Sequence, residues 1–153
     1  MDAFTAELNE LFVTTYHSIC KVEEAMLRSL SNSKLTIAEM HMLEAIGKRR
    51  SQGRTITDLA QDQEISLPSV TMTIKRLEKK GYVCKDKSAE DGRCVRVKLT
   101  REGERAEIAH RYFHRQMVRA VAGAMDEAEK AALLDGLHKL NGFLRHKVEE
   151  MER

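Results

Sequence analysis

Residues 55–99 read TITDLAQDQEISLPSVTMTIKRLEKKGYVCKDKSAEDGRCVRVKL, and this stretch decides the fold. Thr55 is followed three residues later by an aspartate, a spacing typical of a helix N-terminus, and a short helix is predicted to begin there. A turn near residues 64–66 leads to a second helix, with Ser66 as its N-cap and a proline in its first turn, where a missing N–H costs nothing. We expect this helix to run to about Lys80 and to stop at the glycine that follows.

Two β-strands are predicted after the helix pair, over residues 82–87 and 94–99. In the second strand apolar and polar residues alternate strictly, and Asp91-Gly92 between the strands is a strong hairpin-turn dipeptide. Nine basic and four acidic residues lie between Lys75 and Lys98, a net charge of +5 in a chain whose formal net charge is +2. The positive charge is therefore concentrated on the second helix and the hairpin.

This combination is typical of proteins that bind double-stranded DNA. The second helix of such a pair lies in the major groove, and a basic hairpin reaches the flanking minor groove. We expect Arg93 at the hairpin tip to enter that groove, with Asp91 holding its guanidinium extended; the alternative is that both residues only shape a solvated turn.

Hydroxyl, methionine and basic side chains on the second helix suit contacts with phosphates and base edges, although any one of them could instead belong to a solvated face. Backbone amides at two other helix starts, near Thr36 and Thr55, suit phosphate. The candidate DNA-binding residues are Thr36, Thr55, Ser66, Ser69, Thr71, Met72, Thr73, Lys75, Arg76, Lys85, Lys87, Asp91 and Arg93.

Four further helices are predicted around this segment, over residues 4–30, 36–47, 100–122 and 126–151. The first and the last carry an apolar stripe outside the compact core, and such a stripe must be buried somewhere. Burial against a second copy gives a two-fold homodimer, which also sets two recognition helices about one turn of DNA apart.

The expected fold class is mainly α with a small β-wing. We expect a single domain over residues 1–153, with a winged helix-turn-helix core at 31–100 and dimerisation helices at 1–30 and 101–153.

Composition excludes several classes of protein. The 153 residues contain 42% hydrophobic and 33% charged residues, with a single proline and three scattered cysteines. No stretch approaches the roughly 20 apolar residues of a membrane span, and no signal peptide or disulfide framework is apparent, so a cytoplasmic location is expected. We find no nucleophile–base pairing, no phosphate-binding glycine loop and no metal-hydrolase spacing, so neither an enzyme nor a cofactor is predicted.

Several motifs together resemble the MarR family of winged helix-turn-helix regulators. The resemblance covers nearly the whole chain and implies a homodimer that binds a pseudo-palindromic operator, with a ligand or redox signal changing its affinity. The matching motifs are Thr57-Asp58-Leu59-Ala60, the run from Leu67 to Tyr82-Val83, Asp91-Gly92-Arg93, and Val97-Lys98-Leu99-Thr100-Arg101-Glu102-Gly103.

Motifs outside this core are similar to the branch that represses fatty-acid biosynthesis genes in Gram-positive bacteria. In that branch, long-chain acyl-acyl carrier protein is a corepressor that strengthens DNA binding. The motifs are Val22-Glu23-Glu24-Ala25, the run from Glu39 to Lys48, and Phe113-His114-Arg115-Gln116-Met117-Val118.

An acyl chain would need an apolar tunnel between the first, second and fifth helices, and flexible methionines suit its walls. Alternatively, the same residues are ordinary core residues. If a ligand does bind, His41 and His114 could hydrogen-bond its polar end. Three arginines spaced four residues apart, from Arg111 to Arg119, could dock an acidic carrier protein or form a solvated face. The candidate ligand-binding residues are Met26, Met40, His41, Leu43, Phe113, His114 and Met117.

The histidines and cysteines offer other candidate roles. His110 and His114 have the i, i+4 spacing that lets two imidazoles share a metal, but a hydrogen-bonded structural role is favoured and no metal site is predicted. Redox sensing by Cys20 is not favoured, and Cys84 and Cys94 are not expected to pair. The alternative functions are a repressor released by a small aromatic or toxic compound, and a winged-helix protein-interaction module.

Overall fold

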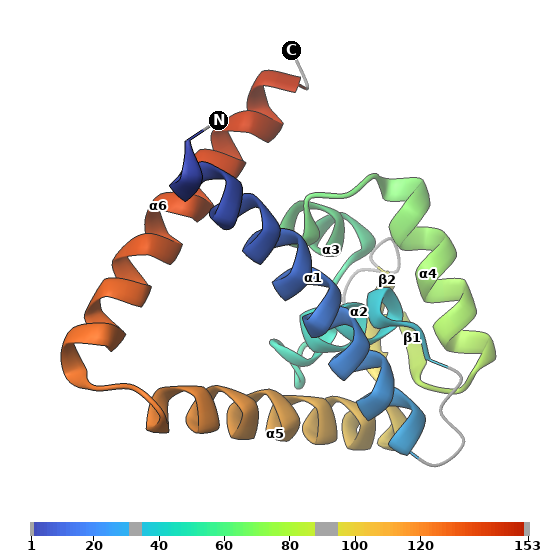
Figure 1. The fold of residues 1–153 in the computed structure, drawn as a ribbon. Helices are drawn as coiled ribbons and strands as arrows, with labels where there is room; N and C mark the ends of the chain where they lie inside the picture. The colour runs from blue at the N-terminus through green and yellow to red at the C-terminus, as the bar shows by residue number, and fades with distance from the viewer. Residues whose placement is uncertain (1, 31–34, 88–94, 152–153) are drawn as a thin grey trace. The chain divides into compact units, whose positions relative to one another are not determined.

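A computed structural model describes residues 2–30, 35–87 and 95–151, with the side chain of Lys87 excepted. The chain divides into two compact units, Met1–Phe113 and His114–Arg153. The elements in chain order are α1 (Ala3–Ser29), α2 (Ile37–Gly47), α3 (Ile56–Gln63), α4 (Leu67–Lys79), β1 (Val83–Lys87), β2 (Val95–Leu99), α5 (Arg101–Gly123) and α6 (Glu127–Met151) (Figure 1). The predicted helix and strand boundaries, with their caps, are confirmed to within one residue.

The helices of the first unit begin where their capping residues predict. Thr36 and Glu39 form a reciprocal capping box at the start of α2, and Thr55 and Asp58 form another at the start of α3. At α3 the two bonds are 3.0 and 3.2 Å long. Each box satisfies two backbone N–H groups that a bare helix end would leave unpaired, so local sequence alone fixes these starts.

The turn between α3 and α4 is set by one left-handed residue. Glu64 has φ 52° and ψ 41°, and the amide of Ile65 then donates to the carbonyl of Ala60 at 3.1 Å. This is the reversal that ends many helices, here without glycine. Ser66 caps α4 directly afterwards, with Pro68 in the first turn, as the sequence predicts.

The strands β1 and β2 form an antiparallel ladder in which Val83 pairs with Leu99 and Lys87 pairs with Val95. This register is centred on position 91, whereas the sequence centres the turn on the dipeptide Asp91-Gly92; residues 88–94 lie outside the described part. Arg54 adds a short bridge to Val97 on the other edge of β2, with N–O distances of 2.9 and 2.7 Å.

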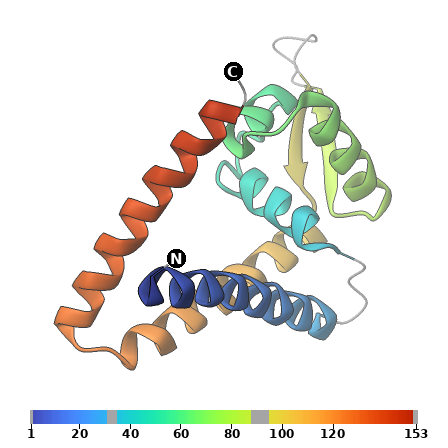
Figure 2. The same cartoon turned by 45° about the horizontal axis from the view of Figure 1, so that its top comes forward.

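The apolar core of the first unit lies where α2, α3 and α4 gather around the two strands, and α1 runs beside α2 (Figures 1 and 2). Residues at helical spacing on α2 and α4, and alternate residues on the strands, point into it. Its members, each at most 4% exposed, include Leu27, Met40, Leu43, Ile46, Leu59, Val70, Ile74, Leu77, Val83 and Val97.

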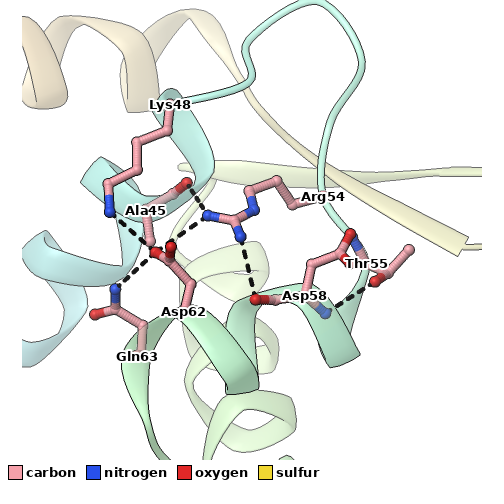
Figure 3. Close-up of polar contacts among 7 residues, drawn as sticks. All are labelled: Ala45, Lys48, Arg54, Thr55, Asp58, Asp62 and Gln63. Atoms are coloured by element: carbon pink, nitrogen blue, oxygen red, sulfur yellow. Dashed lines mark hydrogen bonds and ion pairs between the residues drawn. The ribbon is translucent and has the colours of Figure 1, made fainter.

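A buried guanidinium fastens the segment between α2 and α3 (Figure 3). Arg54 is 8% exposed and donates to the carbonyls of Ala45 and Asp58, each at 3.1 Å. It also pairs with Asp62 at 3.2 Å, and Lys48 reaches the same carboxylate at 3.0 Å. The hydrogen bond from Lys48, with smaller contributions from Gln63 and Arg54, lowers the pKa of Asp62 below its usual value.

Large apolar side chains on α1 and α6 lie outside this core. On α1, Phe4 is 73% and Tyr16 65% exposed, and none of the described α6 residues is buried. In the second unit, Asp126 and Glu129 cap α6 reciprocally through two bonds of 2.9 Å. Within the described residues, no helix combines the length and apolar character required to cross a membrane.

Candidate nucleic-acid interface

The outward face of α4 is defined by what its inner face does. Val70, Ile74 and Leu77 are fully buried, so the helix can present only its opposite side to a partner. That side carries the predicted DNA contacts. Met72 is 54% exposed, Ser66, Ser69, Lys75 and Arg76 are also exposed, and Thr71 and Thr73 are half-buried.

The hydroxyl groups of α4 are already engaged within the helix. Thr71 donates to the carbonyl of Leu67 at 2.8 Å, and Thr73 donates to that of Ser69 at 3.0 Å. The Ser66 and Ser69 hydroxyls pair at 2.8 Å. The two threonine oxygens act as donors in these bonds and keep lone pairs for an incoming donor, and the threonine methyls are held in fixed directions.

The basic residues divide into two groups. Within the described part of the chain, Lys75 and Arg76 have no acidic partner. In contrast, Lys85 on β1 binds Glu78 at 2.7 Å. Among these three described side chains, the unneutralised positive charge lies on α4 and not on β1.

The side chains of three predicted DNA-contacting residues of the hairpin lie outside the described part of the chain. Asp91 and Arg93 lie outside the described residues. Lys87 is placed only through its backbone, as the ladder partner of Val95. Their roles as DNA contacts remain predictions.

The starts of α2 and α3 are less suited to phosphate than the sequence suggests. At α3, bonds from the backbone and hydroxyl of Thr55 lower the pKa of Asp58, so this carboxylate is ionised at neutral pH beside the predicted phosphate-binding amides. At α2, Glu39 lies near Thr36 and is bound by Lys80 at 2.8 and 2.6 Å. A phosphate would therefore meet an acidic side chain at the start of either helix.

The predicted ligand-binding residues lie in different places. Met26, Met40 and Leu43 are core residues, at most 8% exposed. Phe113 is partly buried against the same core, and His41 is exposed. His114 and Met117 belong to the second unit, and both are half-buried.

A groove of about 440 Å³ opens beside α2, but other side chains line it. They include Leu27, Leu35 and Ile37, with Glu24 and Arg28 at its side. Of the predicted tunnel residues, Met26, Met40 and Leu43 are thus packed in the core, as the alternative interpretation expects.

The sequence did not indicate that several charged residues are buried. Glu23, Arg54 and Glu107 are each at most 8% exposed. Glu107 is bound by Arg50 and, at 3.2 Å, by Arg111. Arg111 is therefore not simply part of a solvated arginine stripe. A possible signal was position, because Glu23 lies three residues before Met26 on the buried side of α1.

A tight helix pair, an antiparallel hairpin and an outward basic helix define a winged helix-turn-helix protein of the DNA-binding class. The sequence model of the MarR family matches residues 35–95. The structure resembles FabT of Streptococcus pneumoniae, solved in complex with DNA, with a TM-score of 0.86, 30% identity, and coverage of 93% of this chain and 98% of that one. The chain belongs to the MarR family.

Two other relatives fit this assignment. The transcriptional repressor MdtR of Bacillus subtilis is 27% identical over 84 residues, which cover 55% of this chain and about half, 53%, of that repressor. A DNA complex of MepR from S. aureus superposes with a TM-score of 0.70 at 21% identity, covering 88% of this chain and 94% of that one. At that identity the likeness concerns the fold alone.

Proposed function

We propose that this chain is a homodimeric transcriptional repressor that binds a pseudo-palindromic operator in the cytoplasm. The observation that carries the proposal is the pair Lys75 and Arg76 on the outward face of α4. Both are exposed and have no acidic partner among the described residues, while the inner face of the same helix is fixed in the core. Such a helix can enter a major groove without rearranging the protein.

The wing completes the proposed interface. We assign Arg93 to the minor groove beside each half-site, with Asp91 orienting it, on the basis of the sequence pattern. Ser66, Ser69, Met72 and the threonine methyls of α4 would then contact phosphates and thymine methyls.

The proposed target is a set of fatty-acid biosynthesis genes, with long-chain acyl-acyl carrier protein as corepressor. Support comes from the motifs of residues 22–25, 39–48 and 113–118 and from the likeness to FabT. The dense packing of Met26, Met40 and Leu43 means that an acyl chain would have to displace core contacts to enter. Flexible methionines make that displacement less costly than rigid side chains would.

The test is fluorescence anisotropy of the purified chain on promoter DNA from its own locus and from fatty-acid synthesis genes, at two salt concentrations. Lys75→Ala should weaken binding about equally on all sequences and reduce the slope of log K against log salt by about 1. The control is Arg105→Ala, which removes an exposed charge on α5 whose partner is Glu102. If both variants behave alike, α4 is not the reading helix.

The same assay decides the effector by the sign of its effect. Tighter binding with acyl-acyl carrier protein supports the corepressor, and unchanged binding rejects it while leaving the repressor proposal in place. Weaker binding with a small aromatic compound would favour the alternative of a repressor released by such ligands.

A further inference from the structure

Three potential metal ligands from three helices meet beside α2. They are Glu23 of α1, His41 of α2 and His110 of α5, and one ligand atom from each lies within 4.8 Å of the other two. The Glu23 and His41 side chains are 3.6 Å apart, and the two imidazole centroids are 5.9 Å apart. Glu23 and His110 are buried, whereas the side chain of His41 is 45% exposed.

A fourth residue fixes the orientation of the buried imidazole. Nδ1 of His110 lies 2.7 Å from a carboxylate oxygen of Glu44. With Glu44 ionised, Nδ1 carries the proton and donates it, which places the ring's lone pair on Nε2. A carboxylate bound to one imidazole nitrogen is the arrangement that orients metal-binding histidines and makes them more basic.

We propose that Glu23, His41 and His110 bind one divalent transition-metal ion, with Zn²⁺ as the best-suited metal. Two neutral imidazoles and one carboxylate form a ligand set of the open, three-residue type, in which water takes the fourth position. Ligand atoms around a tetrahedral zinc ion are about 3.3 Å apart, given bonds of about 2.0–2.2 Å. The group therefore needs to contract only modestly, and the exposed His41 can supply the movement.

The competing explanation of the same geometry is an ion pair between protonated His41 and Glu23, without metal. That explanation accounts for the 3.6 Å approach of these two residues. It does not account for the third ligand, His110, which comes from α5, or for the Glu44 carboxylate that orients its ring. The two explanations differ in a measurable way, because only a metal site binds Zn²⁺ in a fixed stoichiometry.

Metal at this site would act on DNA binding through α2. This step rests on the proposed function. Glu39 at the start of α2 binds Lys80 at the end of α4, and α2 also contacts α3 and β2. Zinc would tie α1 and α5 to the helix that supports α4. It would thereby restrict the orientation of the reading helix relative to α1.

The binding test uses the full, tag-free chain after treatment with EDTA. Titration with Zn²⁺ against a chromophoric chelator should give one tight site per chain. His41→Gln and Glu23→Gln should each abolish that site, and Glu44→Gln should weaken it by about 10–100-fold. His138→Gln, on the exposed surface of α6, is the matched control and should bind as the wild type does.

His41 is exposed, so His41→Gln should fold normally, which thermal unfolding of the metal-free proteins will check. Co²⁺ should give the intense visible absorption of a four-coordinate site in the wild type and not in His41→Gln. An unchanged site in both His41→Gln and Glu23→Gln, or no tight site in the wild type, overturns the proposal.

Regulation is tested separately by DNA-binding anisotropy with and without one equivalent of Zn²⁺. A change in affinity that His41→Gln removes supports regulation, and an affinity insensitive to zinc overturns it. If the chain binds no DNA, the proposed function fails, while the zinc titration still decides whether the site exists.

Discussion

Arg54 is buried although the residues around it in the sequence are polar and basic. It ends a run of basic and polar residues, 48–54, between two predicted helices. Its buried guanidinium binds Ala45 on α2 and both Asp58 and Asp62 on α3 (Figure 3). A rigid planar fork with five N–H groups suits this task better than the single ammonium of lysine.

Replacing Arg54 by methionine should lower the free energy of unfolding by about 3–5 kcal/mol, because the carbonyls of Ala45 and Asp58 lose a buried donor and Asp62 loses one of its partners. Chemical denaturation measures the loss. The control is Lys48→Met, which removes the other cation from the same carboxylate. Lys48 is largely exposed, so its loss should cost less than about 1 kcal/mol. Equal costs for the two changes would show that burial of Arg54 contributes little.

At the scale of elements, the start of α5 is hydrogen-bonded to the residues that lead into β1. Thr100 donates from its backbone to the carbonyl of Tyr82 at 3.0 Å, and from its hydroxyl to that of Gly81 at 2.6 Å. Gly103 is the residue that allows this approach. A Cβ there would lie 2.0 Å from the carbonyl oxygen of Tyr82.

Gly103→Ala should therefore destabilise the first unit by about 1–3 kcal/mol or more, since the obstacle is backbone and cannot rotate away. Gly136→Ala is the matched control, because a Cβ there meets nothing within 4 Å in the single chain. Alanine favours a helix over glycine by about 0.5–1 kcal/mol, so the control should not lower the midpoint of thermal unfolding. A stable Gly103→Ala protein would mean that α5 can shift from β1.

At the scale of the whole molecule, the exposed apolar side chains of α1 and α6 need a partner. Residues such as Phe12, Ile19, Leu134 and Phe143 are between 45% and 60% exposed. A monomer rarely leaves so many large apolar side chains in water. We propose that the same helices of a second copy cover them, as in an isologous dimer.

The double change Leu134→Glu and Leu144→Glu should therefore convert the dimer to a monomer, because four charges would enter the two-fold interface. Sedimentation velocity gives the mass, and circular dichroism checks that the helices persist. Lys139→Glu, on the same helix, should leave the dimer intact because Lys139 is a charged residue in a surface pair with Asp135 and adds no apolar area to the interface. A double variant that remains dimeric would place the interface elsewhere.

The sequence predicts what depends on neighbours along the chain. The boxes at Thr36 and Thr55 and the cap at Ser66 follow from spacings of a few residues, and all three are confirmed. The buried ionic contacts were not predictable in this way. Arg50 meets Glu107, 57 positions away, and only the tertiary fold decides that meeting.

The histidines illustrate the same limit within the candidate sites. Spacing drew attention to His110 and His114, which are neighbours on one helix. The fold adds Glu23, 87 positions before His110, and Glu44, 66 positions before it. No periodicity within a helix reports such partners, so the sequence favoured a structural role over a metal site.

The bridge between Arg54 and Val97 also bears on behaviour at high concentration. A two-stranded hairpin has two open edges, and an open edge can recruit strands from other molecules into aggregates. Here the segment at Arg54 occupies the edge of β2, and Gly53, with φ 67°, brings it there. Growth from that side of the hairpin is blocked. Chains at high concentration can thus crowd together without adding strands to the β2 edge of the hairpin.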